Sequence, residues 1–256
     1  MNAAALRYRV LLESLDSWTD EARARHPGVL PCRRGCTACC HGPFDISIAD
    51  VLLLRETVAA LPAVRREALA ARVSAAADRQ RRLAPDWGPP HDIRALGELR
   101  FDALCEALAP EPCPCLEDGG CAVYDGRPTV CRLMGLGLEA LDGRVLPNAC
   151  PIQEDFPAYA ALPAQPFDLT AFEAREEACL VEAGLVVFGN SDAAGYETTV
   201  ALALAEVGEG ESAGMARVIN IRCCGTWRGG RASPQAPCTQ SSRQARCRCG
   251  PNSRRE

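Results

Sequence analysis

The sequence lacks the segments that carry a chain into or across a membrane. Residues 1–30 contain no basic start, apolar block and small-residue cleavage site in the order that marks a signal peptide. No apolar run approaches the roughly 18 residues that a transmembrane helix needs. We therefore expect a cytoplasmic protein with no membrane partner. Thiols stay reduced in that compartment, so clustered cysteines there are more often metal ligands or catalytic groups than disulfide partners.

Lysine and the common catalytic motifs are absent as well. All 28 basic side chains are arginines, which we attribute to the codon bias of a GC-rich genome. No glycine-rich phosphate loop follows a strand, and neither GxSxG nor HExxH occurs. No cysteine is clearly paired with a histidine and an orienting carboxylate, as a nucleophilic site requires. The sequence therefore leaves open whether the protein is an enzyme.

Charge is unevenly distributed along the chain. Residues 217–256 carry nine arginines and one acid, whereas residues 1–216 carry 19 arginines and 32 acids. The acidic body lacks the basic surface on which binding to a phosphate backbone depends, so we expect no nucleic-acid partner for it. After Gly208 the sequence has no apolar periodicity and many turn formers. We predict a disordered, basic, Cys/Arg-rich tail at 209–256, after a cysteine-cluster metal-binding domain at 1–208.

The apolar pattern predicts a mainly helical fold with a small β-hairpin. Asp168 is suited to cap the start of one helix, and Gly189 to end it. Asp142-Gly143 lies between two apolar runs, which is the signal of a two-residue hairpin turn. Helical spacing covers residues 3–25, 46–83 with a break at Leu61-Pro62, 98–109, 168–188 and 195–207.

Four of the sixteen cysteines lie within nine residues, CRRGCTACC, at positions 32, 36, 39 and 40. On a helix they would lie within about 100° of one face, but no leucine or valine shares that stripe, which argues against a core face. Sulfurs on one zinc lie roughly 3.8 Å apart, whereas these positions would span roughly 12 Å of helix. Either the segment folds back on itself, or ligands come from a second group, or a larger iron–sulfur cluster spreads the thiolates.

A second group of cysteines follows in a stretch rich in proline and glycine. Pro112, Pro114 and Gly119-Gly120 favour open turns that leave thiols pointing inward, as a metal-binding loop needs. We interpret the two groups as two halves of one site, around which a single helical domain is organised. The cysteines of this second half are Cys113, Cys115, Cys121, Cys131 and Cys150.

The chain therefore reads, in order, CRRGCTACC, CPCL, CAVY, Arg127-Pro128 and VCRL. This order resembles the YkgJ-like CxxCxxCC cysteine-cluster family of zinc- or iron-chelating domains, to which flagellin lysine N-methylase is related. The match covers residues 32 to about 152, and the residues to about 207 fit as a helical remainder. The resemblance implies metal ligands at Cys32, Cys36, Cys39, Cys40, Cys113, Cys121 and Cys131, with Cys150 as an eighth.

Two departures from the family pattern bear on the ligands. The first gap, between Cys32 and Cys36, is three residues rather than two, and Cys115 stands where the family has phenylalanine. Cys115 is then either a spare thiol or a substitute ligand. Arg127 of the Arg-Pro pair is placed to donate hydrogen bonds to carbonyls or to bound sulfur, and Arg132 to offset the charge of thiolates.

Several other residues near these motifs have two interpretations. His41 follows Cys40 directly, and because consecutive residues seldom both reach one metal, we favour a position beside the ligands or on the surface over ligation. Cys105 and Cys179 lie in helical patterns, where a free cysteine is often a small buried hydrophobe. Asp45, Asp50 and Asp125 lie near the cysteines, and we expect them to serve as helix caps or turn residues rather than as acid–base groups. We expect no metal site in the tail, because the spacing of its cysteines is not that of one; these are Cys223, Cys224, Cys238, Cys247 and Cys249.

The leading hypothesis is a metal-binding protein that holds zinc or an iron–sulfur cluster, because sulfur ligation suits both. One alternative is an iron–sulfur-dependent enzyme, either an oxidoreductase or a protein lysine N-methylase-like enzyme with a protein partner as substrate. Another is a thiol redox sensor that uses Cys39 and Cys40. The spacing of Cys32, Cys36 and Cys39 also fits a radical S-adenosylmethionine motif, but the alternating strands and helices of a barrel are missing.

Overall fold

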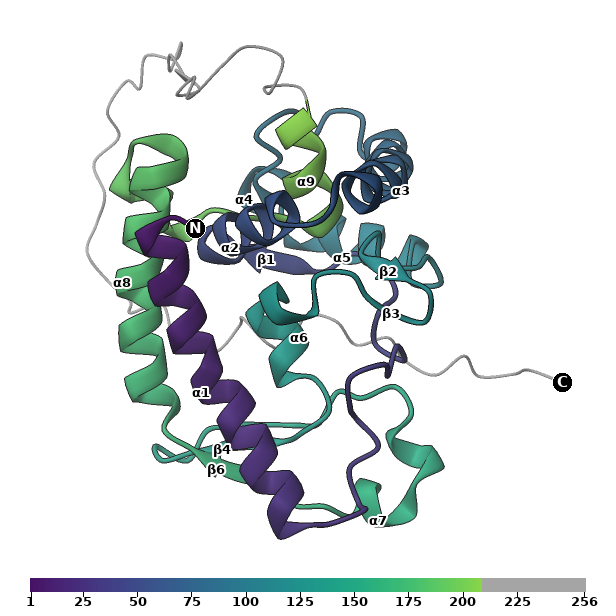
Figure 1. Cartoon of the computed structure of the whole chain (residues 1–256), viewed down its shortest axis with the longest axis vertical. Coiled ribbons are helices and arrows are strands. Elements are labelled where there is room, and N and C mark those ends of the chain that lie inside the picture. Colours follow the sequence, from purple (N-terminus) through teal and green to yellow (C-terminus); the bar gives the residue numbers. More distant parts are fainter. Residues whose placement is uncertain (209–256) are drawn as a thin grey trace, which may run out of the picture.

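The computed structural model describes residues 1–208. The predicted tail at 209–256 and its five cysteines lie outside this part of the chain. The fold is mainly helical with small sheets, as predicted (Figure 1). The helices are α1 (Ala3–Arg25), α2 (Ile48–Ala59), α3 (Ala63–Leu83), α4 (Ile93–Leu96), α5 (Glu98–Ala107), α6 (Thr129–Leu133), α7 (Pro157–Ala160), α8 (Leu169–Phe188) and α9 (Val200–Gly208).

The long helices begin and end where the sequence signals them. Pro62 precedes α3 with φ −54°, which divides the predicted stretch 46–83 into α2 and α3. Asp168 accepts a hydrogen bond from the backbone N–H of Ala171 at 3.0 Å and so caps α8. Gly189 ends the same helix in the left-handed conformation, φ 67°. The helix predicted over 195–207 starts only at 200, because the residues before it form a strand.

Strands are more numerous than the single predicted hairpin. The Asp142-Gly143 turn does join a hairpin, with Gly143 at φ 87°, but a third strand also pairs with it. Each strand is two or three residues long, which is too short to show the alternating pattern by which strands are recognised in a sequence. The three sheets are β1 (Asp45–Ser47) with β7 (Glu197–Thr199), β2 (Leu116–Glu117) with β3 (Gly120–Cys121), and β4 (Leu138–Ala140) between β5 (Val145–Leu146) and β6 (Gln165–Phe167).

The helices enclose two groups of buried apolar side chains. In Figure 1, α1 and α8 run side by side, and an Arg7–Glu182 ion pair of 2.7 Å joins them at the surface. Tyr8, at 1% exposure, lies in the larger apolar group, which α1 and α8 share with α2. The smaller group joins α3 and α5 to α9. Below them lie β4, β6 and α7, so the chain has an upper, helical part and a smaller lower part (Figure 1).

A buried carboxylate, that of Asp50, ties three helices together. It accepts hydrogen bonds from the Tyr8 hydroxyl (2.9 Å), the Thr129 N–H (2.9 Å) and both the N–H and hydroxyl of Ser47 (3.1 and 3.0 Å). The Ser47 hydroxyl accepts in return from the Asp50 N–H at 3.2 Å, which completes a capping box at the start of α2. Asp50 therefore fixes the start of α6, the helix that carries Cys131, against α1 and α2.

Replacing Asp50 should destabilise the fold strongly. Asp50→Ala leaves the Thr129 N–H without its acceptor and removes one of the two hydrogen-bond partners of the Tyr8 hydroxyl, which keeps the Thr129 hydroxyl. We expect a loss of about 2–4 kcal/mol in the free energy of unfolding, measured by urea denaturation. Asp78→Ala is the matched control, because Asp78 only forms an exposed pair with Arg81 at 3.5 Å. Equal stability of the two variants would contradict the role given to Asp50.

Candidate metal centre

The first cysteine group forms two successive turns rather than a helix. Cys36 N–H donates to the Arg33 carbonyl at 2.9 Å, and Cys40 N–H donates to the Thr37 carbonyl at 2.9 Å. Gly35 has φ 92° at the third position of the first turn, where a type II turn requires a positive φ. The segment therefore runs as a turned loop between α1 and β1, which agrees with the expectation that one straight helix does not hold these thiols.

Backbone hydrogen bonds join this loop to the second cysteine group. The Cys113 N–H donates to the Cys40 carbonyl at 2.9 Å, and the Gly42 N–H donates to the Glu111 carbonyl at 2.7 Å. His41 pairs with Pro112 between them as an antiparallel bridge. The two motifs, which are about seventy residues apart in the sequence, thus meet as neighbouring strands of backbone. His41 itself is exposed on the surface.

Backbone amides point at two sulfurs of the second group. The Cys113 sulfur accepts a hydrogen bond from the Cys115 thiol and another from the Cys115 N–H, and both lower the pKa of Cys113. The same thiol bond and burial raise the pKa of Cys115. Cys121, in β3, accepts from the Val123 N–H, although burial outweighs this bond and raises the pKa of Cys121. Amides that donate to sulfur favour thiolates, and thiolates are the form that binds metal.

Cys131 and Cys39 lie close to these sulfurs. Burial raises the pKa of Cys131, and the charges of Cys113, Cys39 and Cys121 add to this effect. The Cys39 thiol is hydrogen-bonded to Cys40, and this bond, followed by burial, raises the pKa of Cys39. The charges of neighbouring thiolates thus raise one another's pKa, and a bound metal ion would offset those charges.

Cys32 lies in a different setting, against the lower part of the chain. A methyl group added to Gly135 would lie 3.0 Å from the Cys32 sulfur and 3.3 Å from the Tyr159 hydroxyl. That hydroxyl donates to the Gly135 carbonyl at 2.6 Å and is hydrogen-bonded with Cys150 as well. Burial raises the pKa of Cys32 to about 11, and the charges of Cys39, Cys36 and Cys150 add to the rise. Neither Gly135 nor Tyr159 carries a sequence signal that would have marked it.

The arginines of the motif hold the second group in place through other contacts. Arg132 donates to the carbonyls of Arg127 and Asp125, at 3.2 and 2.9 Å, and pairs with Asp16 of α1. Arg127 also pairs with Asp16, at 2.5 Å, and stacks on the Tyr124 ring at 4.2 Å. Arg127 also donates to the Tyr124 carbonyl at 3.1 Å, which is one of the two kinds of hydrogen bond expected of it. The Arg132 guanidinium thus contacts Asp16 and two backbone carbonyls.

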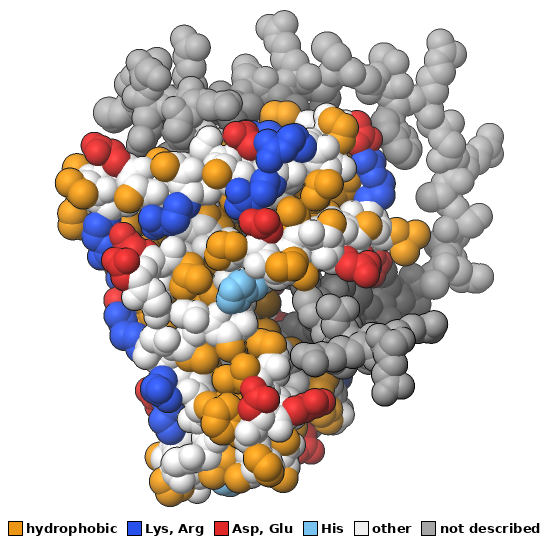
Figure 2. Space-filling view, turned by 90° about the vertical axis from the view of Figure 1, so that its right-hand side faces the viewer, with side chains coloured by type: hydrophobic (Ala, Val, Ile, Leu, Met, Phe, Trp, Pro, Cys, Tyr) orange, Lys and Arg blue, Asp and Glu red, His pale blue; other side chains and the backbone are white. Residues whose placement is uncertain are grey.

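One hollow is lined by most of the candidate ligands. Its cavity volume is about 1530 Å³, and α1, α5 and α6 contribute to its walls. Figure 2 shows the molecule hollowed between its upper and lower parts, with orange side chains, the class that includes cysteine, gathered there. The cysteines that line the hollow are Cys32, Cys36, Cys39, Cys40, Cys105, Cys113, Cys115, Cys121 and Cys131.

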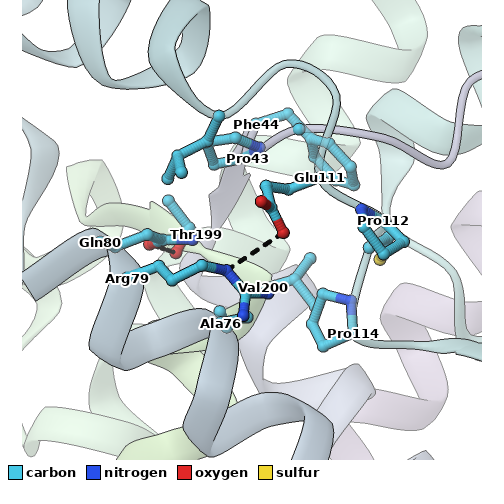
Figure 3. A pocket seen from close by; sticks show the side chains of 14 residues that line it. Pro43, Phe44, Ala76, Arg79, Gln80, Glu111, Pro112, Pro114, Thr199 and Val200 are labelled. Carbon is cyan, nitrogen blue, oxygen red and sulfur yellow. Dashed lines mark hydrogen bonds and ion pairs between the residues drawn. The ribbon is translucent and has the colours of Figure 1, made fainter.

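A much smaller pocket lies behind the backbone bridge, with room for about one water molecule. Its cavity volume is about 20 Å³, and an Arg79–Glu111 ion pair of 3.1 Å crosses it (Figure 3). Gln80 accepts a hydrogen bond from the Thr199 hydroxyl at 2.7 Å on the far wall. Cys113 lines both this pocket and the large hollow. The residues around this pocket therefore pack behind the bridge and do not form a second binding site.

The structure gathers the two cysteine groups but does not close them into a finished metal site. Within residues 1–208, no three side chains of cysteine, histidine, aspartate or glutamate lie close enough to hold a metal ion as they stand. The expected ligand Cys150 is tied to Cys32 through Tyr159, and the other seven line the hollow. A fold organised around an assembled cysteine-ligated metal is therefore not shown, and the ligand set remains a prediction.

Residues with two interpretations mostly have structural roles. Cys179 is buried in the larger apolar group, as expected. Cys105 is buried too, although it also borders the hollow. Asp50 is a cap, as described above, and Asp125 forms an exposed pair with Arg34. No helix among residues 1–208 has the length and apolar character needed to cross a membrane.

The contact between Cys32 and Gly135 can be tested with a matched pair of variants. Gly135 and Gly143 have similar positive φ values, 92° and 87°, but a methyl group at Gly143 would meet nothing within 4 Å. Backbone strain is thus common to Gly135→Ala and Gly143→Ala, and only the first crowds the Cys32 sulfur. We expect Gly135→Ala to lose about 1–3 kcal/mol more in the free energy of unfolding. An equal loss would show that Cys32 does not pack on this glycine.

The thiols should also differ in the pH at which they react. In the reduced, metal-free chain, the rate of alkylation follows the thiolate fraction. Because the pKa of Cys113 is lowered and that of Cys32 is raised to about 11, the Cys113 rate should level off while the Cys32 rate still rises roughly tenfold per pH unit. Peptide mass spectrometry after iodoacetamide pulses measures both. If the alkylation rates of Cys113 and Cys32 had the same pH midpoint, the two thiols would not lie in different environments.

The comparisons with known proteins bear on the same segment of the chain. Residues 31–151 match the family model described as "CxxCxxCC: Putative zinc- or iron-chelating domain". No curated protein and no solved structure matched. The matched segment contains both cysteine groups and the bridge between Cys40 and Cys113. Residues 31–151 therefore belong to the CxxCxxCC family, in agreement with the resemblance found in the sequence.

Proposed function

We propose that the protein binds zinc or an iron–sulfur cluster through thiolates from both cysteine groups. The observation that carries the proposal is the backbone bridge, which brings Cys40 beside Cys113 at the edge of the hollow. Either group alone offers at most five thiols on one stretch of chain. Joined by the bridge, they offer a shared set of soft sulfur ligands, and sulfur-rich ligation suits zinc and iron–sulfur clusters.

The residues present fit such a metal in their chemistry. The sulfurs of Cys113 and Cys121 accept backbone N–H bonds, which stabilise thiolates. The raised pKa values of Cys39 and Cys131 have like-charged thiols among their causes, and a bound cation would lower them. A metal would supply the charge that holds the thiolates together. The ligands we propose are Cys32, Cys36, Cys39, Cys40, Cys113, Cys121, Cys131 and Cys150, with Cys115 as a hydrogen-bond donor to Cys113.

The redox-sensor hypothesis has weaker support. A sensor thiol reacts as a thiolate, so its pKa is low. The bond to Cys40 and burial hold the pKa of Cys39 high instead. An enzymatic function rests only on the relation to flagellin lysine N-methylase, and similarity of fold is a weak basis for an activity.

Removing one proposed ligand should lower the bound metal. We expect the full chain, purified without oxygen, to contain zinc or iron by elemental analysis, with a visible absorption band if the iron is in a cluster. Cys131→Ser should weaken binding roughly tenfold or more, since even outer-shell changes reach that size. Cys179→Ser is the control, because Cys179 lies in the apolar group of α8.

Two results would contradict this proposal. A colourless chain with neither metal would remove metal binding altogether. Equal metal content in Cys131→Ser and Cys179→Ser would exclude Cys131 from the ligands, while leaving the binding of a metal elsewhere in the chain intact.

A further inference from the structure

The candidate thiols fall into two sets that different parts of the fold hold in place. The upper set, Cys113, Cys121 and Cys131, lies at the β2–β3 hairpin and α6. The lower set is Cys32 and Cys36, from the loop after α1, and Cys150, from the segment before α7. In Figure 1 that loop runs from the end of α1, near α7, up past β3 to β1.

The lower set is anchored by contacts that the upper set does not share. The Tyr159 hydroxyl is hydrogen-bonded with Cys150 and lies beside the same Gly135 backbone against which the Cys32 sulfur packs. Tyr159 is 1% exposed, so its ring is fixed in position. Arg23 of α1 donates to the Cys32 carbonyl at 3.0 Å and holds the loop at this end.

The upper set has anchoring contacts of its own. Asp50 accepts the Thr129 N–H and so positions the helix of Cys131. The N–H groups of Cys115 and Val123 hold the sulfurs of Cys113 and Cys121. Among the thiols, Cys113, Cys39 and Cys121 act on Cys131, whereas Cys39, Cys36 and Cys150 act on Cys32.

Cys39 and Cys40 lie at the junction of the two sets. Cys39 is close to Cys32 and also to Cys113, and the Cys40 carbonyl accepts the Cys113 N–H. A tetrahedral zinc or a four-iron cluster takes four thiolates. Three thiols in each set and one from the junction pair give four on each side.

From this division, and resting on the proposed function, we propose that the chain holds two separate thiolate centres rather than one. The upper centre takes Cys113, Cys121 and Cys131, and the lower centre takes Cys32, Cys36 and Cys150. Cys39 and Cys40 supply one thiolate to each. Tyr159 is a positioning residue for the lower centre alone.

Counting zinc ions on the full chain tests the proposal. Serine replaces Cys223, Cys224, Cys238, Cys247 and Cys249, so that only thiols of the described part are counted. The reduced, metal-free chain is titrated with Zn²⁺ alone, and native mass spectrometry counts the bound ions. We expect two ions on this chain, one after Cys32→Ser with Cys150→Ser, one after Cys113→Ser with Cys121→Ser, and none after all four changes.

A milder variant covers the case in which a double substitution unfolds the chain. Tyr159→Phe keeps the buried ring and removes only the hydroxyl beside Cys32 and Cys150. It should weaken one ion by about 10- to 100-fold, the usual size of an outer-shell effect, and leave the other unchanged. A purely structural role for Tyr159 would weaken both ions alike or neither.

The outcomes separate this proposal from the one it rests on. One ion per chain, or two ions that are lost together with either pair of substitutions, would overturn the two centres and leave metal binding intact. No bound zinc at any concentration would contradict the proposed function itself.

Discussion

The antiparallel bridge between residues 40–42 and 111–113 is the interaction on which the candidate site depends. Two backbone hydrogen bonds, from Cys113 N–H to Cys40 and from Gly42 N–H to Glu111, set the positions of both cysteine groups. Backbone groups donate and accept whatever side chains they carry, so the bridge itself uses none of the thiols. Its far side is closed by the Arg79–Glu111 pair, which keeps the bridge against α3.

Buried charges and hydrogen bonds extend this constraint into the helices. Asp50 connects α1, α2 and α6, and Asp16 of α1 pairs with both motif arginines, Arg127 and Arg132. The helices thus contact the second cysteine group at two places, through Asp50 and through Asp16. Single ion pairs at the surface contribute little to stability, but the Arg132 side chain is 2% exposed, so breaking its contacts would leave a buried charge unpaired.

The sequence predicted the helices better than the small sheets, and it predicted the cysteine motif better than the residues that hold the cysteines in place. Helix ends were predicted correctly at Leu61-Pro62, Asp168 and Gly189, because the conformational preferences of these residues are local and are kept in the fold. The cysteine motif identified the family segment because its spacing is specific. Gly135 and Tyr159 escaped notice because their role exists only through contact with Cys32, about a hundred residues away in the chain. Strands of two or three residues give no periodic signal, and the late start of α9 follows from the pairing of β7 with β1.

The most direct test of thiolate ligation is X-ray absorption at the zinc or iron edge of the full chain purified without oxygen. The account predicts a first shell of sulfur alone, at about 2.3 Å for zinc. A first shell dominated by nitrogen or oxygen near 2.0–2.2 Å would contradict it, because the cysteines of both groups would then not be the ligands of the bound metal.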